Sequence, residues 1–221
     1  MKLTCVISAK VVWLLDINLI NPTGLSPKSL LEGIRDRYGF AKAPAHMHDR
    51  NEKNALSFEQ GEFVNSKGTP ILISLTVFND GIVAESVSST NDAMEFLQDL
   101  SLFIPSLGFS FPPPQTIAKG FTSLLQVECD APLLSVNSRL ERIIRFIESR
   151  LTTMDGNPRK YEVAALNFWS EDLSKNYAPS EFKFERKIGL SFSSNQYFSR
   201  APLQTFEHLE LLDELEKLLA S

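Results

Sequence analysis

The sequence predicts an α+β fold built on a mostly antiparallel sheet, with helices on one face. Strand-like segments are joined by short turns such as Asn79-Asp80-Gly81, which is typical of antiparallel hairpins. Along 71–78, apolar residues alternate with Ser74 and Thr76, so one face of the sheet is expected to be polar and free of helices. Four segments with helical apolar spacing would cover the other face.

The first half of the chain, residues 1–110, is expected to run strand, helix, three strands, helix. Ser26 and Pro27 suit the start of the first helix, and Gly39 suits its end. Ser89 or Thr90 is expected to cap the second helix. The expected ranges are 3–20, 56–64, 71–78 and 82–87 for strands, and 26–39 and 90–104 for helices.

The second half, residues 111–221, is expected to repeat this order after the stiff connector Pro112-Pro113-Pro114. We expect the two halves to pack as one continuous domain. The expected ranges are 120–129, 161–169 and 182–192 for strands, 136–151 for the first helix, and Thr205 onward for the last. In the helix 136–151, the residues expected to face the core are Leu140, Ile143, Ile144 and Ile147.

A faint internal repeat supports this division. Residues 72–100 lie over 187–215 at a spacing of 115, with six identities in 29 positions. The trace Leu31-Glu32-x-Ile34 recurs as Leu140-Glu141-x-Ile143 at a spacing of 109. The two spacings predict a duplication, with a net six extra residues between the first helix and the central hairpin of the second half. This order of elements is similar to the duplicated saddle of the TATA-binding-protein fold, a resemblance of topology that implies no function.

Composition and charge narrow the classes of function. The 221 residues are 43% hydrophobic and include 16 Phe, enough for a sizeable core. The net charge of −5 does not suit a protein that grips phosphate backbones, so we do not expect a nucleic-acid partner. Cys5 and Cys129 are expected as buried free thiols. No apolar run is long enough to span a membrane, and we expect a cytoplasmic, bacterial or phage-borne protein.

Sequence motifs of catalysis are missing. The chain has no nucleophile elbow, no phosphate-binding loop and no dinucleotide fingerprint. We therefore expect a protein that is not an enzyme and that needs no cofactor. The only cluster of metal-ligand residue types is His46, His48 and Asp49, with Glu52 nearby. Two readings of this cluster are open: a metal site, or a solvated polar loop.

Three further groups of residues are candidates for binding a partner. The last helix is acidic, and its candidate residues are Glu207, Glu210, Asp213 and Glu214. The segment with Tyr197, Phe198 and Arg200 is a candidate strand edge onto which a partner strand would add, because the following Pro202 suits an edge strand or the end of a strand. The alternative for this segment is burial under the last helix. Arg139, Arg142 and Arg145 recur every three residues, and form a basic stripe on the outer face of one helix. A solvated helix face is the alternative for both charged groups.

These observations favour a non-enzymatic protein-binding module. The predicted function is an acidic inhibitor or immunity-type protein, which occludes a basic partner such as a nuclease toxin. One alternative is a metal-dependent enzyme or ligand-binding site around His46, His48 and Asp49. Another is a nucleic-acid or nucleotide binder on the open sheet face. The polar residues expected on that face have mixed charge, which disfavours this second alternative; they are Ser74, Thr76, Lys183, Glu185, Lys187 and Ser191.

Overall fold

The computed structural model describes residues 1–21, 24–49, 55–171 and 178–220. Within them the chain forms an eight-stranded sheet in which each neighbouring pair of strands is antiparallel. The strands are β1 (Lys2–Leu14), β2 (Leu56–Val64), β3 (Pro70–Val77), β4 (Gly81–Ser86), β5 (Ala118–Glu128), β6 (Ala165–Phe168), β7 (Phe182–Arg186) and β8 (Gln196–Ala201). The helices are α1 (Pro27–Tyr38), α2 (Thr90–Ser106), α3 (Glu141–Asp155) and α4 (Thr205–Ala220). The expected α+β fold with an antiparallel sheet is confirmed.

Each half of the chain builds one half of the sheet. The strand order is β2-β3-β4-β1-β5-β8-β7-β6, so β1 and β5 meet at the centre and the other strands follow outward in the same succession on both sides. β1 and β5 pair over their full lengths, from Lys2 opposite Glu128 to Leu14 opposite Ala118. Both halves therefore have the expected order of elements. Their origin by duplication stays a prediction.

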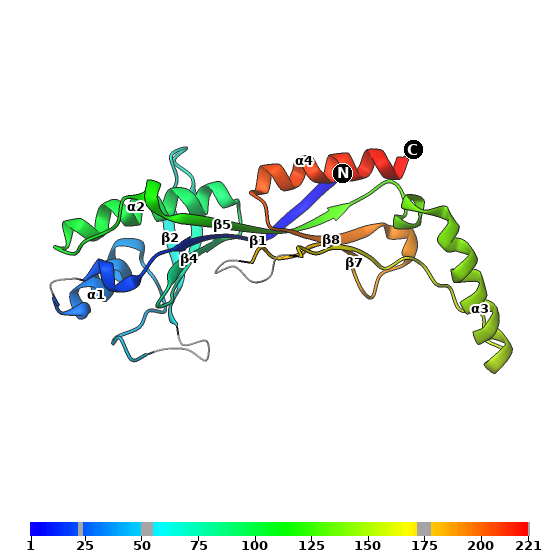
Figure 1. The fold of residues 1–221 in the computed structure, drawn as a ribbon, viewed down its shortest axis with the longest axis horizontal. Coiled ribbons are helices and arrows are strands. Elements are labelled where there is room, and N and C mark those ends of the chain that lie inside the picture. The colour runs from blue at the N-terminus through cyan, green and yellow to red at the C-terminus, as the bar shows by residue number, and fades with distance from the viewer. Residues whose placement is uncertain (22–23, 50–54, 172–177, 221) are drawn as a thin grey trace.

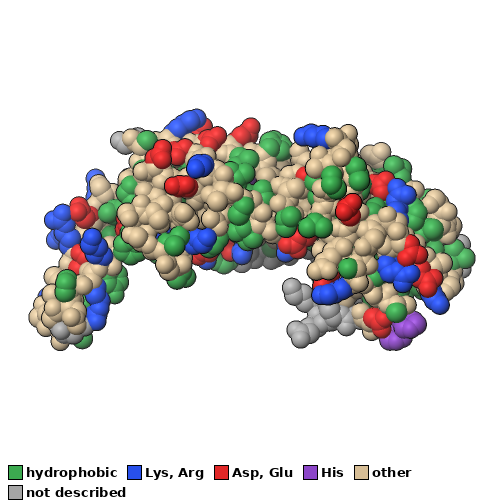
Figure 2. Space-filling model, turned by 180° about the vertical axis from the view of Figure 1, so that it is seen from behind, with side chains coloured by type: hydrophobic (Ala, Val, Ile, Leu, Met, Phe, Trp, Pro, Cys, Tyr) green, Lys and Arg blue, Asp and Glu red, His purple; other side chains and the backbone are tan. Residues whose placement is uncertain are grey.

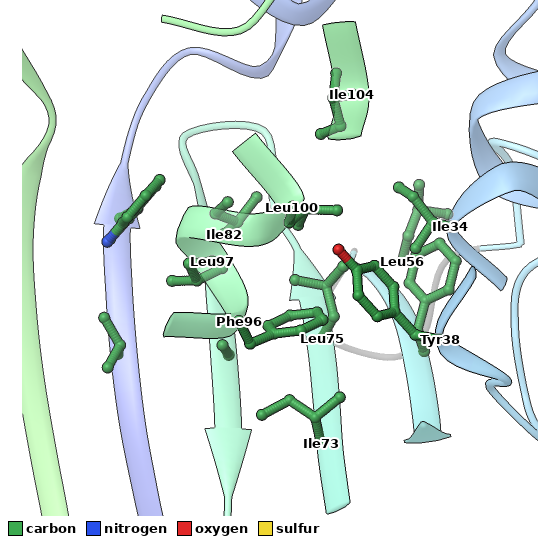
Figure 3. Packing of buried hydrophobic residues seen from close by; sticks show 14 of the residues in the cluster. Ile34, Tyr38, Leu56, Ile73, Leu75, Ile82, Phe96, Leu97, Leu100 and Ile104 are labelled. Carbon is green, nitrogen blue, oxygen red and sulfur yellow. The ribbon is translucent and has the colours of Figure 1, made fainter. Parts of the chain in front are cut away.

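Three helices cover one face of the sheet (Figure 1). α2 lies over β1 and β4, α4 lies over β5, and α1 packs at the outer edge beside β2. Figure 3 shows how side chains from α1, α2 and the strands converge on one core in the first half. A second core in the other half gathers residues from β5, β7, β8 and α4. No helix among the described residues has both the length and the apolar character needed to cross a bilayer.

Strand alternation decides which side chains reach these cores. In β1, Ala9, Val11 and Trp13 are fully buried under the helices, while the intervening Lys10 and Val12 lie on the open face. The helix ends follow the expected chemistry. Pro27 occupies the first turn of α1, and Gly39 ends that helix with a φ of 60°, which glycine adopts without steric cost. The hydroxyl of Ser89 accepts the N–H of Asp92 at 3.1 Å and caps α2.

The first residues of α2 and α4 satisfy each other at the centre of the molecule. The N–H of Thr90 donates to the hydroxyl of Thr205 at 2.9 Å, and the N–H of Thr205 donates to the hydroxyl of Thr90 at 2.8 Å. N–H groups in a first helical turn have no partner within the helix, so a buried helix start needs an acceptor from elsewhere. Here each helix supplies the acceptor for the other.

In the structure, the six extra residues of the second half lie at a different position from the one expected. Ala84 and Ser199 are equivalent at a spacing of 115, whereas their strand partners Leu75 and Phe184 are equivalent at a spacing of 109. The spacing therefore changes inside the hairpin: residues 78–80 join β3 to β4, and the longer segment 187–195 joins β7 to β8. The expected position, before the hairpin, is wrong.

Three expected strands are shorter than the sequence pattern predicts. β1 ends at Leu14 rather than 20, and Ile17–Ile20 form a short 3-10 helix instead. β7 ends at Arg186 rather than 192, because the chain turns at Gly189 with a φ of 87°, and Ile188 is 96% exposed. β6 covers only Ala165–Phe168 rather than 161–169, and Trp169 beyond it is exposed. The polar sequence over 170–180 also predicts a loop, and its residues 172–177 lie outside the described residues.

Two expectations about burial are also corrected. Cys129 is buried, but Cys5 is exposed, because it is paired with Gln126 on the open face of the sheet. In α3, Ile143 and Ile147 are exposed rather than turned to the core, since this helix leaves the sheet and projects from the end of the molecule (Figure 1).

We expect the reciprocal threonine pair to contribute measurably to stability. Thr90→Val or Thr205→Val keeps the shape of the side chain and leaves one buried helix N–H without an acceptor, at a cost of about 1–2 kcal/mol each. Thr→Ser at the same positions keeps the hydroxyl and is the matched control. Urea unfolding measures the free energy. A valine variant as stable as its serine counterpart would contradict this role.

Candidate functional site

The outer surface of α4 carries most of the acidic residues predicted to bind a partner. Five carboxylates stand along this helix against a single lysine, Lys217. Asp213 and Glu214 have side chains 65% and 68% exposed, and Glu210 is exposed as well. Glu210 makes no ion pair or hydrogen bond within the described part of the chain. The helix is held rigidly, because Leu212, Leu215 and Leu219 on its other side lie in the second core.

Not all the predicted acidic residues are free to meet a partner. The carboxylate of Glu207 accepts the backbone N–H of Gln204 at 3.0 Å and so serves the start of its own helix. Asp213 accepts from the Met1 ammonium at 3.3 Å, and Glu216 binds the same group. Glu214 is paired with Lys217 in the next turn. Glu210, with the exposed Asp213 and Glu214, is therefore the accessible part of the predicted acidic site.

The predicted partner-binding edge at Tyr197, Phe198 and Arg200 is wrong. These residues lie in β8, which is paired on one side with β5 and on the other with β7, so it has no free edge for an added strand. The ring of Tyr197 is fully buried and stacks on Phe184 with centroids 4.4 Å apart. Its hydroxyl accepts the backbone N–H of Leu133 at 3.2 Å. The signal that misled the sequence argument was Pro202, which fits the end of an inner strand equally well.

Phe198 and Arg200 instead lie on the open face of the sheet, which carries charges in neighbouring opposite pairs. Arg200 binds Glu181 at 3.2 Å, and the ammonium of Lys187 lies 5.6 Å from the ring centroid of Phe198. The other pairs on this face are Lys10 with Glu85, Lys183 with Glu185, and Lys2 with Glu128. Such internal pairing leaves little net positive charge for a phosphate backbone.

His46 and His48, two of the predicted metal-ligand residues, lie close together. Their rings stack in parallel with centroids 5.1 Å apart, and His48 Nε2 lies 3.7 Å from Asp49 Oδ1. The other oxygen of Asp49 accepts the backbone N–H groups of His46 and Ala45, and these hydrogen bonds lower the pKa of the carboxyl. Among the described residues, no three His, Cys, Asp or Glu side chains converge on one point. Glu52 lies outside the described residues.

A buried polar cluster surrounds His208, and it was not predicted from the sequence. Its imidazole is completely buried between α4 and the sheet, with Nδ1 2.5 Å from the Ser123 hydroxyl and Nε2 2.7 Å from the Ser199 hydroxyl. Burial lowers the pKa of His208 to about 4, so the ring is neutral at pH 7. A neutral imidazole has one donor and one acceptor, and the two serines satisfy both.

The first half of the chain has only alanines at the equivalent positions. The strand pairings place Ala9 and Ala84 where the second half has Ser123 and Ser199, and Ala93 stands where His208 stands. All three alanines are fully buried. The spacing of His208 from Leu212 and Leu215 places it on the buried side of α4, and this signal was present in the sequence. Which serines meet it depends on strand register, which the sequence did not reveal.

A small apolar cavity lies in the first half between α1, α2 and the sheet. Its volume is about 240 Å³, and residues such as Leu31, Phe58 and Ile104 line it. Ligand sites of small molecules commonly measure roughly 300–1,000 Å³ and carry a few convergent polar groups. The polar side chains lining this cavity are Asn18 and Asn21, and Asn21 is already bonded to the backbone of Leu25. We assign no site here.

Helix α3 exposes several large apolar side chains. Ile143 and Phe146 are 57% and 60% exposed, and Met154 is also exposed. The predicted basic stripe lies beside them: Arg139, Arg142 and Arg145 line a shallow surface hollow together with Ile143 and Phe146. In Figure 2, α3 hangs from the left end of the molecule with basic side chains along it. Exposed apolar side chains beside basic ones are typical of a surface that contacts another molecule.

No protein-family model and no curated protein matches this sequence, so the functional argument rests on the geometry alone.

We expect His208 to make stability depend on pH in a definite direction. Its pKa is about 4 in the folded protein and 6.5 as the ordinary value, so the unfolded chain binds the proton more readily. The stabilisation is complete above pH 6.5 and is lost as the pH falls from 6.5 to 4, by about 3 kcal/mol. Urea unfolding at several pH values, with His208→Gln as the comparison, measures it. A difference between wild type and variant that does not change with pH would contradict the assignment.

Proposed function

We propose that this chain is a non-enzymatic cytoplasmic protein that works by binding another protein. In its sharper form, the proposal is an acidic inhibitor or immunity-type protein of bacterial origin that masks a basic partner, such as a nuclease toxin. The observation that carries it is the outer surface of α4. There, exposed carboxylates stand on a helix whose opposite side is fixed in the core.

The mechanism would be occlusion assisted by charge. Glu210, Asp213 and Glu214 create a negative field that steers a basic surface toward α4 and raises the association rate. Because α4 is anchored by buried leucines and by His208, binding would cost little ordering of the backbone. The partner's basic surface would then be covered, which blocks access of its own acidic or nucleic-acid substrate.

Two features of the site favour protein over nucleic acid as the partner. Several basic side chains of the open sheet face are already matched by carboxylates, as in Lys10 with Glu85 and Arg200 with Glu181. The exposed surface of α4 is negative and would repel a phosphate backbone. The remaining arginines on α3 are interleaved with apolar side chains, which is more typical of a protein interface.

The test begins with capture of a partner from a lysate of the native host at low salt, followed by binding kinetics with that purified partner. Glu210→Lys combined with Asp213→Lys should lower the association rate about tenfold or more at low ionic strength, and less at high salt. The matched control is Glu32→Lys with Asp36→Lys on α1, which makes the same charge change at two other exposed carboxylates.

The control variant should associate as fast as wild type. Equal slowing by both variants would mean that only net charge matters and would remove α4 as the binding surface. Tight binding of the wild type to nucleic acid, without any protein partner, would overturn the proposal as a whole.

A further inference from the structure

The exposed apolar side chains of α3 correspond to side chains of α1 that are buried. At the spacing of 109, Leu140, Ile143 and Ile147 correspond to Leu31, Ile34 and Tyr38 of α1. All three side chains of α1 are only 4% exposed. The same positions in α3 are half-buried or exposed. The second half therefore has the apolar pattern of the packed helix without the packing.

The first half shows where such a helix docks. α1 lies in the groove between α2 and β2 at the outer edge of the sheet (Figure 3). Tyr38 packs its ring on Phe96 of α2 with centroids 4.8 Å apart. Arg37 forms a bidentate ion pair with Asp99 of α2, at 2.8 Å and 3.1 Å. Apolar packing and one ion pair to the neighbouring helix thus hold α1 in place.

The chain itself explains why α3 does not return to its own half. In the first half, Gly39 stops α1, and Phe40 turns back into the core, where it is 4% exposed. The corresponding residues are Glu148 and Ser149, which continue the helix. α3 therefore runs on to Asp155, about two turns further, and shortens the connection to β6. The backbone N–H of Tyr161 then bonds to Glu148 at 2.8 Å, which ties that connection to α3.

The part of α4 and β6 that corresponds to the groove filled by α1 is more exposed than its counterpart in the first half. The counterparts of Phe96, Asp99 and Phe103 in α2 are Leu211, Glu214 and Leu218 in α4. Phe96 is fully buried, whereas Leu211 is half-buried and Leu218 is 64% exposed. On the outer strand, Phe58 of β2 is buried, whereas Leu166 of β6 is half-buried and Phe168 is exposed. Glu214 stands where the first half has the carboxylate that receives Arg37.

We propose that a second copy of this chain fills the groove with its own α3. Helix α3 of each chain docks between α4 and β6 of the other, as α1 docks between α2 and β2 within the first half. The exchange is reciprocal, so it closes as a two-fold dimer with the same contacts made twice. A short connection that prevents a helix from folding back within its own chain is a recognised route to such exchange.

Charge fits this occupant. Phe146 is the counterpart of Arg37 in α1. Arg142 lies one helical turn before Phe146, and Arg150 lies one turn after it. Arg142 has no ion pair within the described residues, and the guanidinium of Arg150 lies over the Phe146 ring, 5.1 Å from its centroid. Docking would bring one of these arginines to Glu214 of the partner while Ile143 and Ile147 enter the groove. The second copy would thus give α4 and β6 the apolar packing and the ion pair that α1 gives α2 and β2 within the first half.

The test is the mass of the full chain in solution, measured by sedimentation equilibrium and light scattering over a dilution series. Wild type should be a dimer. Ile143→Glu should be a folded monomer, because this side chain is already exposed on the single chain and its replacement leaves both cores intact. Ser149→Glu adds the same charge to the opposite side of α3 and should remain a dimer. Circular dichroism and urea unfolding of each variant confirm that it is folded.

Reversal of the charges on both sides of the proposed contact tests whether α3 docks at this groove. Glu214→Arg should weaken the dimer at least tenfold, and the addition of Arg142→Glu and Arg150→Glu should restore it. A wild-type monomer at all concentrations would overturn the proposal, as would a dimer that Ile143→Glu leaves unchanged. A dimer lost with Ile143→Glu but indifferent to the charge reversal would overturn the assigned groove. Glu214 also belongs to the proposed partner surface, but the dimer is measured on the purified chain alone. These outcomes are therefore separate from those that test the proposed function.

Discussion

The structure depends on the antiparallel contact between β1 and β5. This pair joins two half-sheets of the same topology, and it sets α2 and α4 with their first turns against each other above the centre. A helix start placed there is buried, and its N–H groups need acceptors. Thr90 and Thr205 meet that need for each other, which fixes the positions of both helices with two hydrogen bonds. The position of each helix then determines which side chains of the outer strands pack against it.

On this shared frame, a few residues make the halves different. Three buried alanines of the first half are replaced by Ser123, Ser199 and His208 in the second, so a van der Waals contact between helix and sheet becomes a hydrogen-bonded one. Gly39 and Phe40 are replaced by Glu148 and Ser149, so one helix stops and turns inward while the other continues into solvent. The exposed apolar stripe of α3, which we assign to the dimer contact, arises from the second of these differences.

The sequence predicted the fold class, the order of elements and the helix caps, because these depend on local periodicity and turn chemistry. It failed where the outcome depended on partners remote in the chain. The apolar alternation through Ile188 looked like strand, yet Gly189 turns the chain into solvent there. Tyr197 looked like an edge residue, and only strand order shows that β8 is enclosed. For the candidate site, the acidic character of α4 was evident from the sequence. The sequence did not show that Glu207 caps its own helix while Glu210 is accessible, because this depends on contacts in the folded chain.

The two proposed binding surfaces share Glu214 and otherwise use different sides of α4. Glu214, Leu211 and Leu218 belong to the side that faces β6, by their correspondence to the residues of α2 that hold α1. Glu210 and Asp213 lie on the outward side, away from the buried Leu212 and Leu215. Docking of a second copy would therefore cover the apolar flank of α4 and leave its acidic ridge in solvent. A two-fold dimer would present that ridge twice, and two linked surfaces bind a partner that can engage both more tightly than either does alone.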